Sequence, residues 1–207
     1  MFVKTALTLA SLLSVANAHY WILSVDGQTS CLRDFPNNSI AMNPVTGSQI
    51  YNDDIVCNIA RPLTPAHVKP PCVYNAGSKM TVLWYENPSR HPGPYAVYAA
   101  KQGSGPLKWS KIYEEGYNAV TKVWSHDRVI ANGNKFDWTI PKELSSGLWV
   151  FRIEHVALHG ASSPGGSQHY MRCVDVEIRN GGSATPDQGY DFPGLYQPNS
   201  PGLLLEW

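Results

Sequence analysis

The fold is decided by two stretches of the sequence, LWVFRIEHVA at residues 148–157 and HYMRCVDVEI at residues 169–178. Apolar side chains recur at every second position within them, as Val174, Val176 and Ile178 do in the second stretch. A period of two is typical of a β-strand, because successive side chains of a strand point to opposite faces. Both stretches are therefore predicted to be strands.

Four shorter stretches share these features and are separated by Gly, Pro and Asn. They are Trp21–Val25, Met80–Tyr85, Tyr95–Ala100 and Phe136–Ile140. No segment longer than about ten residues has the apolar spacing of an amphipathic helix. Many strands joined by Pro- and Gly-rich turns predict an all-β protein, an immunoglobulin- or fibronectin-like β-sandwich with long loops and few short helices.

The composition limits the class of partner. Charged residues make up 15% of the chain and the formal net charge is zero. Nucleic acids and anionic membranes both require a basic surface, so we expect neither as a partner. The seven Trp and eleven Tyr would suit contact with sugar rings, although most aromatic residues in any domain belong to its core.

The first residues have the pattern of a secretory signal peptide. Lys4 supplies the positive charge, Ala6–Val15 form the apolar run, and Ala16–Ala18 fit the small-x-small cleavage site. The apolar run is shorter than the roughly 20 residues that span a bilayer. We therefore expect residues 1–18 to be removed and the protein to be secreted, which leaves His19 as the first residue.

An N-terminal histidine can offer a metal ion two nitrogens, from its α-amine and from its imidazole. If a second histidine joins them, three nitrogens can lie in one plane around the ion. This arrangement suits the tetragonal preference of Cu(II), whereas zinc prefers a tetrahedral set of ligands. The leading histidine therefore predicts a site for one copper ion.

Four cysteines in a secreted chain predict two disulfides, and their spacing lacks the CxxC pairs of a zinc site. Four cysteines allow three connectivities, and the spacing does not choose among them. The cysteines are Cys31, Cys57, Cys72 and Cys173. The sequon Asn37-Asn38-Ser39 predicts a glycan at Asn37.

Other side chains with chemical potential lie in loops and at strand ends. His91 lies in a rigid Pro/Gly loop and is either a metal ligand or a solvated loop residue. Gln168 and Tyr170 share one face of a predicted strand, and His169 lies on the other face. The pair is either part of a functional site or part of the core. His159 ends a predicted strand and opens a glycine-rich loop. We expect the remaining histidines to be structural or solvated: His67, His126 and His155.

Several motifs follow one another along the chain. They are His19, Cys57-Asn58, His91–Pro94, Arg152–His159, Gly165–Cys173 and Phe192–Tyr196. In this order they resemble the fungal lytic polysaccharide monooxygenases of auxiliary activity family 9, once called glycoside hydrolase family 61. The resemblance covers essentially the whole chain after the signal peptide. No single motif carries it, whereas the ordered set with a leading histidine is highly specific.

The resemblance implies a role for each candidate site residue. The amine and ring of His19 and the ring of His91 would hold one copper ion, with the Tyr170 hydroxyl as an axial ligand. His159 and Gln168 would lie beside the oxygen site and, with Tyr170, form the catalytic group.

The resemblance also implies a disulfide between Cys57 and Cys173, which leaves Cys31 with Cys72. Tyr196 would stack on the polysaccharide at a flat face. Weaker candidates for the same contact are Tyr20, Trp21 and Tyr190.

The chain departs from the family pattern at three places. His169 stands where the family usually has Phe, and His155 stands where it usually has an aliphatic residue. The segment from Trp84 to His91 is short. Because His169 faces away from Tyr170, we expect no change at the copper site, whereas the short loop puts in doubt a transfer of substrate range from relatives with longer loops.

The resemblance implies a monomeric enzyme whose residues 19–207 form a single copper monooxygenase domain without a separate carbohydrate-binding module. A small-molecule or protein electron donor would reduce the copper, and O2 or H2O2 would be the oxidant. Hydrogen would be removed at C1 or C4 of a β-1,4-glucan, with cellulose as the expected substrate and hemicellulose as the alternative.

Two other functions are weighed against this one. A glycoside hydrolase needs two carboxylates about 5 to 9.5 Å apart, and the acidic residues show no pattern that implies such a pair. Those residues are Asp53, Asp54, Glu114, Glu115, Glu154 and Asp175. A copper-binding protein without turnover would need the histidine ligands, but it would not need His159, Gln168 and Tyr170 together.

Overall fold

The computed structural model describes residues 20–34, 43–58, 68–85, 91–103, 105–186 and 189–205. The predicted copper ligand His19 and the predicted glycosylation site Asn37 lie outside these residues. None of the helices in the described part of the chain is long and apolar enough to cross a membrane.

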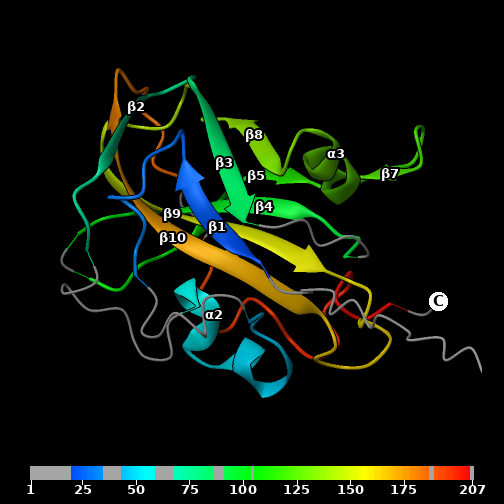
Figure 1. Ribbon diagram of the computed structural model, residues 1–207. Coiled ribbons are helices and arrows are strands. Elements are labelled where there is room, and N and C mark those ends of the chain that lie inside the picture. The colour runs from blue at the N-terminus through cyan, green and yellow to red at the C-terminus, as the bar shows by residue number, and fades with distance from the viewer. Residues whose placement is uncertain are drawn as a thin grey trace, which may run out of the picture.

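Two sheets form the centre of the protein, and a short third sheet lies beside them (Figure 1). The three-stranded sheet has the order β1 (Trp21–Val25), β3 (Lys79–Tyr85), β8 (Lys135–Thr139). The five-stranded sheet has the order β2 (Cys72–Asn75), β10 (Gln168–Arg179), β9 (Gly147–Ala157), β4 (Tyr95–Lys101), β5 (Ser110–Glu115). The third sheet pairs β6 (Tyr117–Asn118) with β7 (Val123–Trp124). In the two larger sheets only the β2–β10 pair is parallel.

The fold class agrees with the prediction from the sequence. All six predicted strands are present as β1, β3, β4, β8, β9 and β10, each within one residue of the expected bounds. In the described residues the helices are few and short: η1 (Gly47–Tyr51), α2 (Asp54–Cys57) and α3 (Ser125–Ala131). Four strands were not predicted from the sequence: β2 and β5, which are the edge strands of the five-stranded sheet, and the short pair β6 and β7.

The long strands β9 and β10 are buried on both faces. On one face, side chains such as Phe151 and Val174 pack against the three-stranded sheet. On the other face, Val150 and Met171 pack under α2 and under the C-terminal segment that contains Phe192. Figure 1 shows β1 and β3 in front of β9 and β10, with α2 below β10.

Two disulfides brace this arrangement. Cys57 at the end of α2 is bonded to Cys173 in β10, with a Cα–Cα distance of 5.3 Å. Cys31 is bonded to Cys72 at the start of β2, with a Cα–Cα distance of 5.5 Å. The structure therefore contains the pairing that the family resemblance implied.

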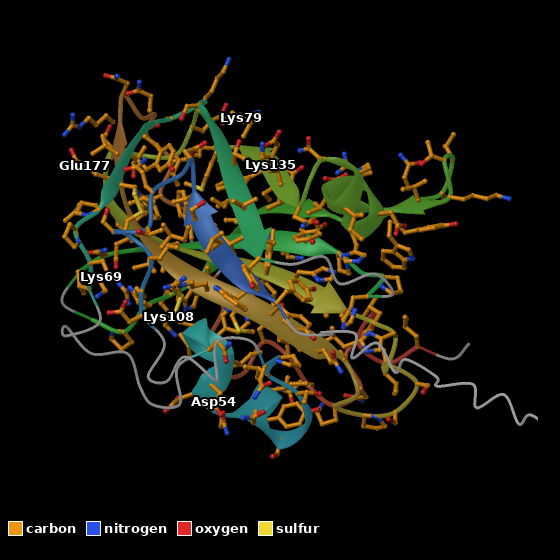
Figure 2. The ribbon with its side chains drawn as sticks, viewed as in Figure 1. Asp54, Lys69, Lys79, Lys108, Lys135 and Glu177 are labelled. Atoms are coloured by element: carbon orange, nitrogen blue, oxygen red, sulfur yellow. A yellow bond between two sulfur atoms is a disulfide. The ribbon has the colours of Figure 1, made fainter. Side chains whose placement is uncertain are left out.

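The pairing of strands brings distant segments to one end of the sandwich. β10 begins where β9 ends, since Gln168 is paired with Ala157. β1 begins beside the end of β3, since Trp21 is paired with Tyr85. Figure 2 labels Lys79 and Glu177, which lie toward the opposite end of these strands.

Candidate metal centre

The loop that carries His91 is pressed against the end of β9. The amide of Leu158 donates to the carbonyl of Pro92 at 2.8 Å, and the amide of Val156 donates to that of Pro94 at 3.0 Å. A Cβ atom at Gly93 would lie 1.8 Å from the carbonyl oxygen of Val156, so only glycine allows this approach. The loop therefore holds the His91 side chain in a fixed place, where it is 6% exposed.

His159 follows the end of β9 and lies beside His91. Their ring centroids are 4.4 Å apart and the rings are tilted by 67°. His159 is exposed to solvent on its other side. Partial burial lowers the pKa of His159 below its ordinary value of 6.5, so the ring is neutral at neutral pH.

Gln168 and Tyr170 lie on the same face at the start of β10, as strand alternation predicts. The Tyr170 hydroxyl donates to Oε1 of Gln168 at 2.9 Å, and the Tyr170 ring lies 5.9 Å from that of His91. Burial raises the pKa of Tyr170, so the hydroxyl keeps its proton. Because Oε1 of Gln168 already accepts this bond, its amide nitrogen is the group left to donate.

Tyr20 packs beneath these residues. Its ring stacks on Tyr170 with a centroid distance of 4.0 Å, and its edge meets His91 at 5.8 Å. The ring is 1% exposed, so it offers no open face to a sugar, which argues against the expected contact of Tyr20 with substrate. Tyr20 directly precedes β1 and has the same parity as Ile22, which is also buried.

These donors fit copper better than zinc. His91 would supply an imidazole nitrogen and Tyr170 a neutral hydroxyl oxygen, and a nitrogen donor with a weak oxygen donor suits copper. Within the described residues, no three His, Cys, Asp or Glu side chains gather in a way that could hold a metal ion. A metal ion at His91 therefore needs a further ligand from outside them, and His19 directly precedes Tyr20 in the chain.

Comparison with known proteins agrees with this arrangement. The family model described as "Auxiliary Activity family 9 (formerly GH61)" matches residues 14–207. The chain belongs to auxiliary activity family 9.

Curated relatives of this AA9 chain are similar along almost all of it. The AA9 lytic polysaccharide monooxygenase F of Malbranchea cinnamomea is 35% identical over 98% of the chain and 92% of the relative. Monooxygenase A of Collariella virescens is 34% identical over 99% of the chain and 81% of the relative. The chain spans 58% of the length of a third relative, monooxygenase A of Aspergillus terreus.

Solved structures show the same fold. CvAA9A is 32% identical, with a TM-score of 0.75 over 91% of both chains. Cel61B from Hypocrea jecorina is 26% identical, with a TM-score of 0.77 over 92% of both chains. Membership of AA9 makes this protein a copper-dependent polysaccharide monooxygenase with one copper ion, which acts with a reductant and with O2 or H2O2.

The C-terminal residues of the AA9 chain that were expected to bind substrate pack on the face of the five-stranded sheet opposite to Tyr170. Tyr196 is half-buried, its ring packs on Phe192 and His169, and its hydroxyl donates to Glu154 at 2.6 Å. Tyr190 and Tyr196 line a cavity of about 360 Å³ over β4 and β5. Stacking of Tyr196 and Tyr190 on a polysaccharide stays a prediction.

Two partly exposed aromatic side chains lie at the start of β1 and the end of β3. Trp21 is half-buried and stacks on Tyr85 at 4.1 Å, and Tyr85 is 39% exposed. From the sequence, Trp21 was a weaker candidate for substrate contact, and Tyr85 was predicted only as the end of a strand. The register of β1 against β3, which no local pattern reveals, brings the two rings together.

The buried acidic residues do not provide a hydrolase pair. Glu154 is bound by Arg152 at 2.7 Å, and Asp175 is bound by Arg33 at 2.6 Å, with all four side chains almost completely buried. Each of these two carboxylates is thus fixed by an arginine in the interior. The structure favours a structural role for both.

Proposed function

We propose that this AA9 chain is a secreted, monomeric monooxygenase that oxidises a β-1,4-glucan at C1, C4 or both. Cellulose is the proposed substrate. The observation that carries the proposal is the gathering of His91, His159, Gln168 and Tyr170 at one end of the sandwich. These residues come from the loop before β4, the turn after β9 and the start of β10. The ring centroid of His91 lies 4.4 Å from that of His159 and 5.9 Å from that of Tyr170.

The copper ligands would be the amine and ring of His19, the ring of His91 and, more weakly, the hydroxyl of Tyr170. Tyr20 supports this set, because its backbone continues directly from His19 and its ring lies against His91 and Tyr170. Signal cleavage after Ala18 is part of the proposal, since only cleavage there frees the amine of His19. When bound, copper supplies the one-electron chemistry that activates O2 or H2O2 after reduction by a small-molecule or protein donor.

His159 and Gln168 would orient the oxygen co-substrate and position its proton by hydrogen bonding. The neutral ring of His159 can donate a hydrogen bond from one nitrogen and accept one at the other. The amide nitrogen of Gln168 can donate from the neighbouring strand. Tyr170 remains protonated and bonded to Gln168, so it holds the amide in one orientation.

The exposed side of His159 leaves room for a polysaccharide chain at this end of the molecule. We expect extended or crystalline chains to reach the site on that side. Tyr196, Trp21 and Tyr190 are the candidates for contact with sugar rings, and Asn37 is the candidate for a glycan.

The function is tested by loading the mature protein with copper and adding ascorbate and phosphoric-acid-swollen cellulose. Mass spectrometry should detect oligosaccharides oxidised at C1 or at C4, which also assigns the site of attack. The same protein stripped with EDTA, and His91→Ala supplied with copper, should release none. Products without reductant would indicate a hydrolase, and tight copper binding without products would indicate a copper-binding protein.

A further inference from the structure

His155 is a buried histidine that connects two parts of the candidate copper site. It lies on the inner face of β9, is 0% exposed, and its Nδ1 shares a hydrogen bond with the hydroxyl of Tyr20. Tyr20 is the residue directly after His19. One nitrogen of His155 is therefore joined to the segment that would bring the N-terminal ligand.

The other side of the His155 ring faces the loop of the second ligand. The backbone of His91 and of Gly93 lies beside the ring, although Nε2 makes no hydrogen bond with a described residue. The next residue along β9, Val156, binds the same loop through its backbone, with its amide donating to Pro94 at 3.0 Å.

Stacking fixes the plane of the His155 ring. The ring of His126, from α3, is parallel to it within 8° at a centroid distance of 4.8 Å. The ring of Tyr95, from β4, lies 4.5 Å away and is tilted by 21°. α3 is itself tied to the loop, because the Ser125 hydroxyl donates to the carbonyl of Gly93 at 3.1 Å. The ring is thus held in one orientation by two other elements.

We propose that His155 is a positioning residue that sets the separation of the two segments carrying His19 and His91, and so the geometry of the copper site. The inference rests on the ligand set of the proposed function. His155 would act through Tyr20 on one side and through the His91 loop on the other, without binding the metal.

An aliphatic residue at this position would change the site in a defined way. The Tyr20 hydroxyl is buried, and without His155 it would lose its acceptor, which is unfavourable for a buried polar group. Tyr20 would then shift or rotate, and its stacking on Tyr170 would change with it. The effect should reach the copper site because Tyr20 also contacts the ring of His91.

The test compares His155→Leu with His155→Gln in the mature protein, using copper alone as the probe. Gln can accept from Tyr20 through its oxygen and donate toward the loop through its nitrogen, whereas Leu can do neither. His155→Leu should bind Cu(II) about 10- to 100-fold more weakly in calorimetric titration, as is usual for loss of a supporting contact. Its EPR hyperfine splitting should also change. His155→Gln should recover most of both properties.

His169→Phe is the matched control. It removes another buried histidine of the same sheet, but one on the opposite face, bonded to Glu154 and Ser167 rather than to Tyr20. Its copper affinity and EPR spectrum should equal those of the wild type. If His155→Leu does not fold, Tyr20→Phe replaces it, because this change removes only the hydroxyl, and the same weaker binding is expected.

The outcomes separate this inference from the proposed function. Wild-type copper affinity and spectrum in His155→Leu, or in Tyr20→Phe where that variant stands in, would overturn the positioning role. The proposed function would still stand if the wild type released oxidised oligosaccharides. Failure of the wild type to bind copper through His19 and His91 would instead remove the proposed function.

Discussion

Glu154 keeps its charge inside the protein because three side chains bind its carboxylate. Arg152 donates to both oxygens at 2.7 and 2.8 Å, His169 lies 2.8 Å away, and the Tyr196 hydroxyl donates at 2.6 Å. Burial alone would raise the pKa of Glu154, but Arg152 and His169 hold it well below its ordinary 4.5. The same network joins β9 and β10 to the C-terminal segment through Tyr196.

Glu154→Gln should therefore destabilise the protein by about 3 to 5 kcal/mol at neutral pH, because it leaves the buried Arg152 without its counter-charge. A folded-state pKa below the unfolded value gives a stabilisation that is complete above pH 4.5 and is lost as the pH falls below it. Urea unfolding at neutral and acidic pH measures both effects. The variant should lose less stability in acid than the wild type, and an equal loss in both would contradict this account.

At the scale of elements, the decisive contact is that between the His91 loop and β9. The loop is paired to the strand by backbone hydrogen bonds at Pro92 and Pro94. Gly93 lies between them with no space for a side chain. The position of the proposed copper ligand thus depends on backbone packing next to it.

Gly93→Ala should push the loop off the strand, because its Cβ would lie 1.8 Å from the carbonyl oxygen of Val156. We expect a loss of about 1 to 3 kcal/mol or more in stability, together with weaker copper binding. The nearby Gly116→Ala is the control, since its Cβ would meet Pro94 at an ordinary 3.8 Å. Thermal unfolding and copper titration of both variants would decide. Equal behaviour of the two would argue against the packing explanation.

At the scale of the whole molecule, the two disulfides close loops of very different length. Cys57 and Cys173 are 116 residues apart, and Cys31 and Cys72 are 41 apart. The first bond joins α2 to the face of the five-stranded sheet that lies away from Tyr170. It therefore braces the layer that covers the sheet rather than the candidate site.

Replacement of both Cys57 and Cys173 by Ala should lower the free energy of unfolding by about 5 kcal/mol, against about 4 kcal/mol for the other pair, in the chain-entropy model. Copper affinity of the folded double variant should remain that of the wild type. Denaturant unfolding and calorimetry supply the two measurements. A larger loss from the shorter loop would show that native contacts, rather than chain entropy, dominate.

Local patterns in the chain were enough to predict six of the strands, the fold class and the family. Alternation along residues 148–157 and 169–178 is a local property, so it can be recognised without knowledge of any other segment. The same parity rule correctly placed Gln168 and Tyr170 on one face and His169 on the other. The edge strands β2 and β5 were not predicted because they are short and carry polar residues, which interrupt the alternation of apolar and polar positions.

Which side chains meet could not be predicted from such local patterns. Sheet order and register bring Tyr20 onto Tyr170 and His91, and they turn the Tyr196 hydroxyl inward to Glu154. They also gave His155 a partner in Tyr20, although its sequence neighbours offered no sign of one. Such contacts join residues far apart in the chain, and their energies depend on packing across layers. A local pattern fixes which face a side chain occupies, but not what lies opposite it.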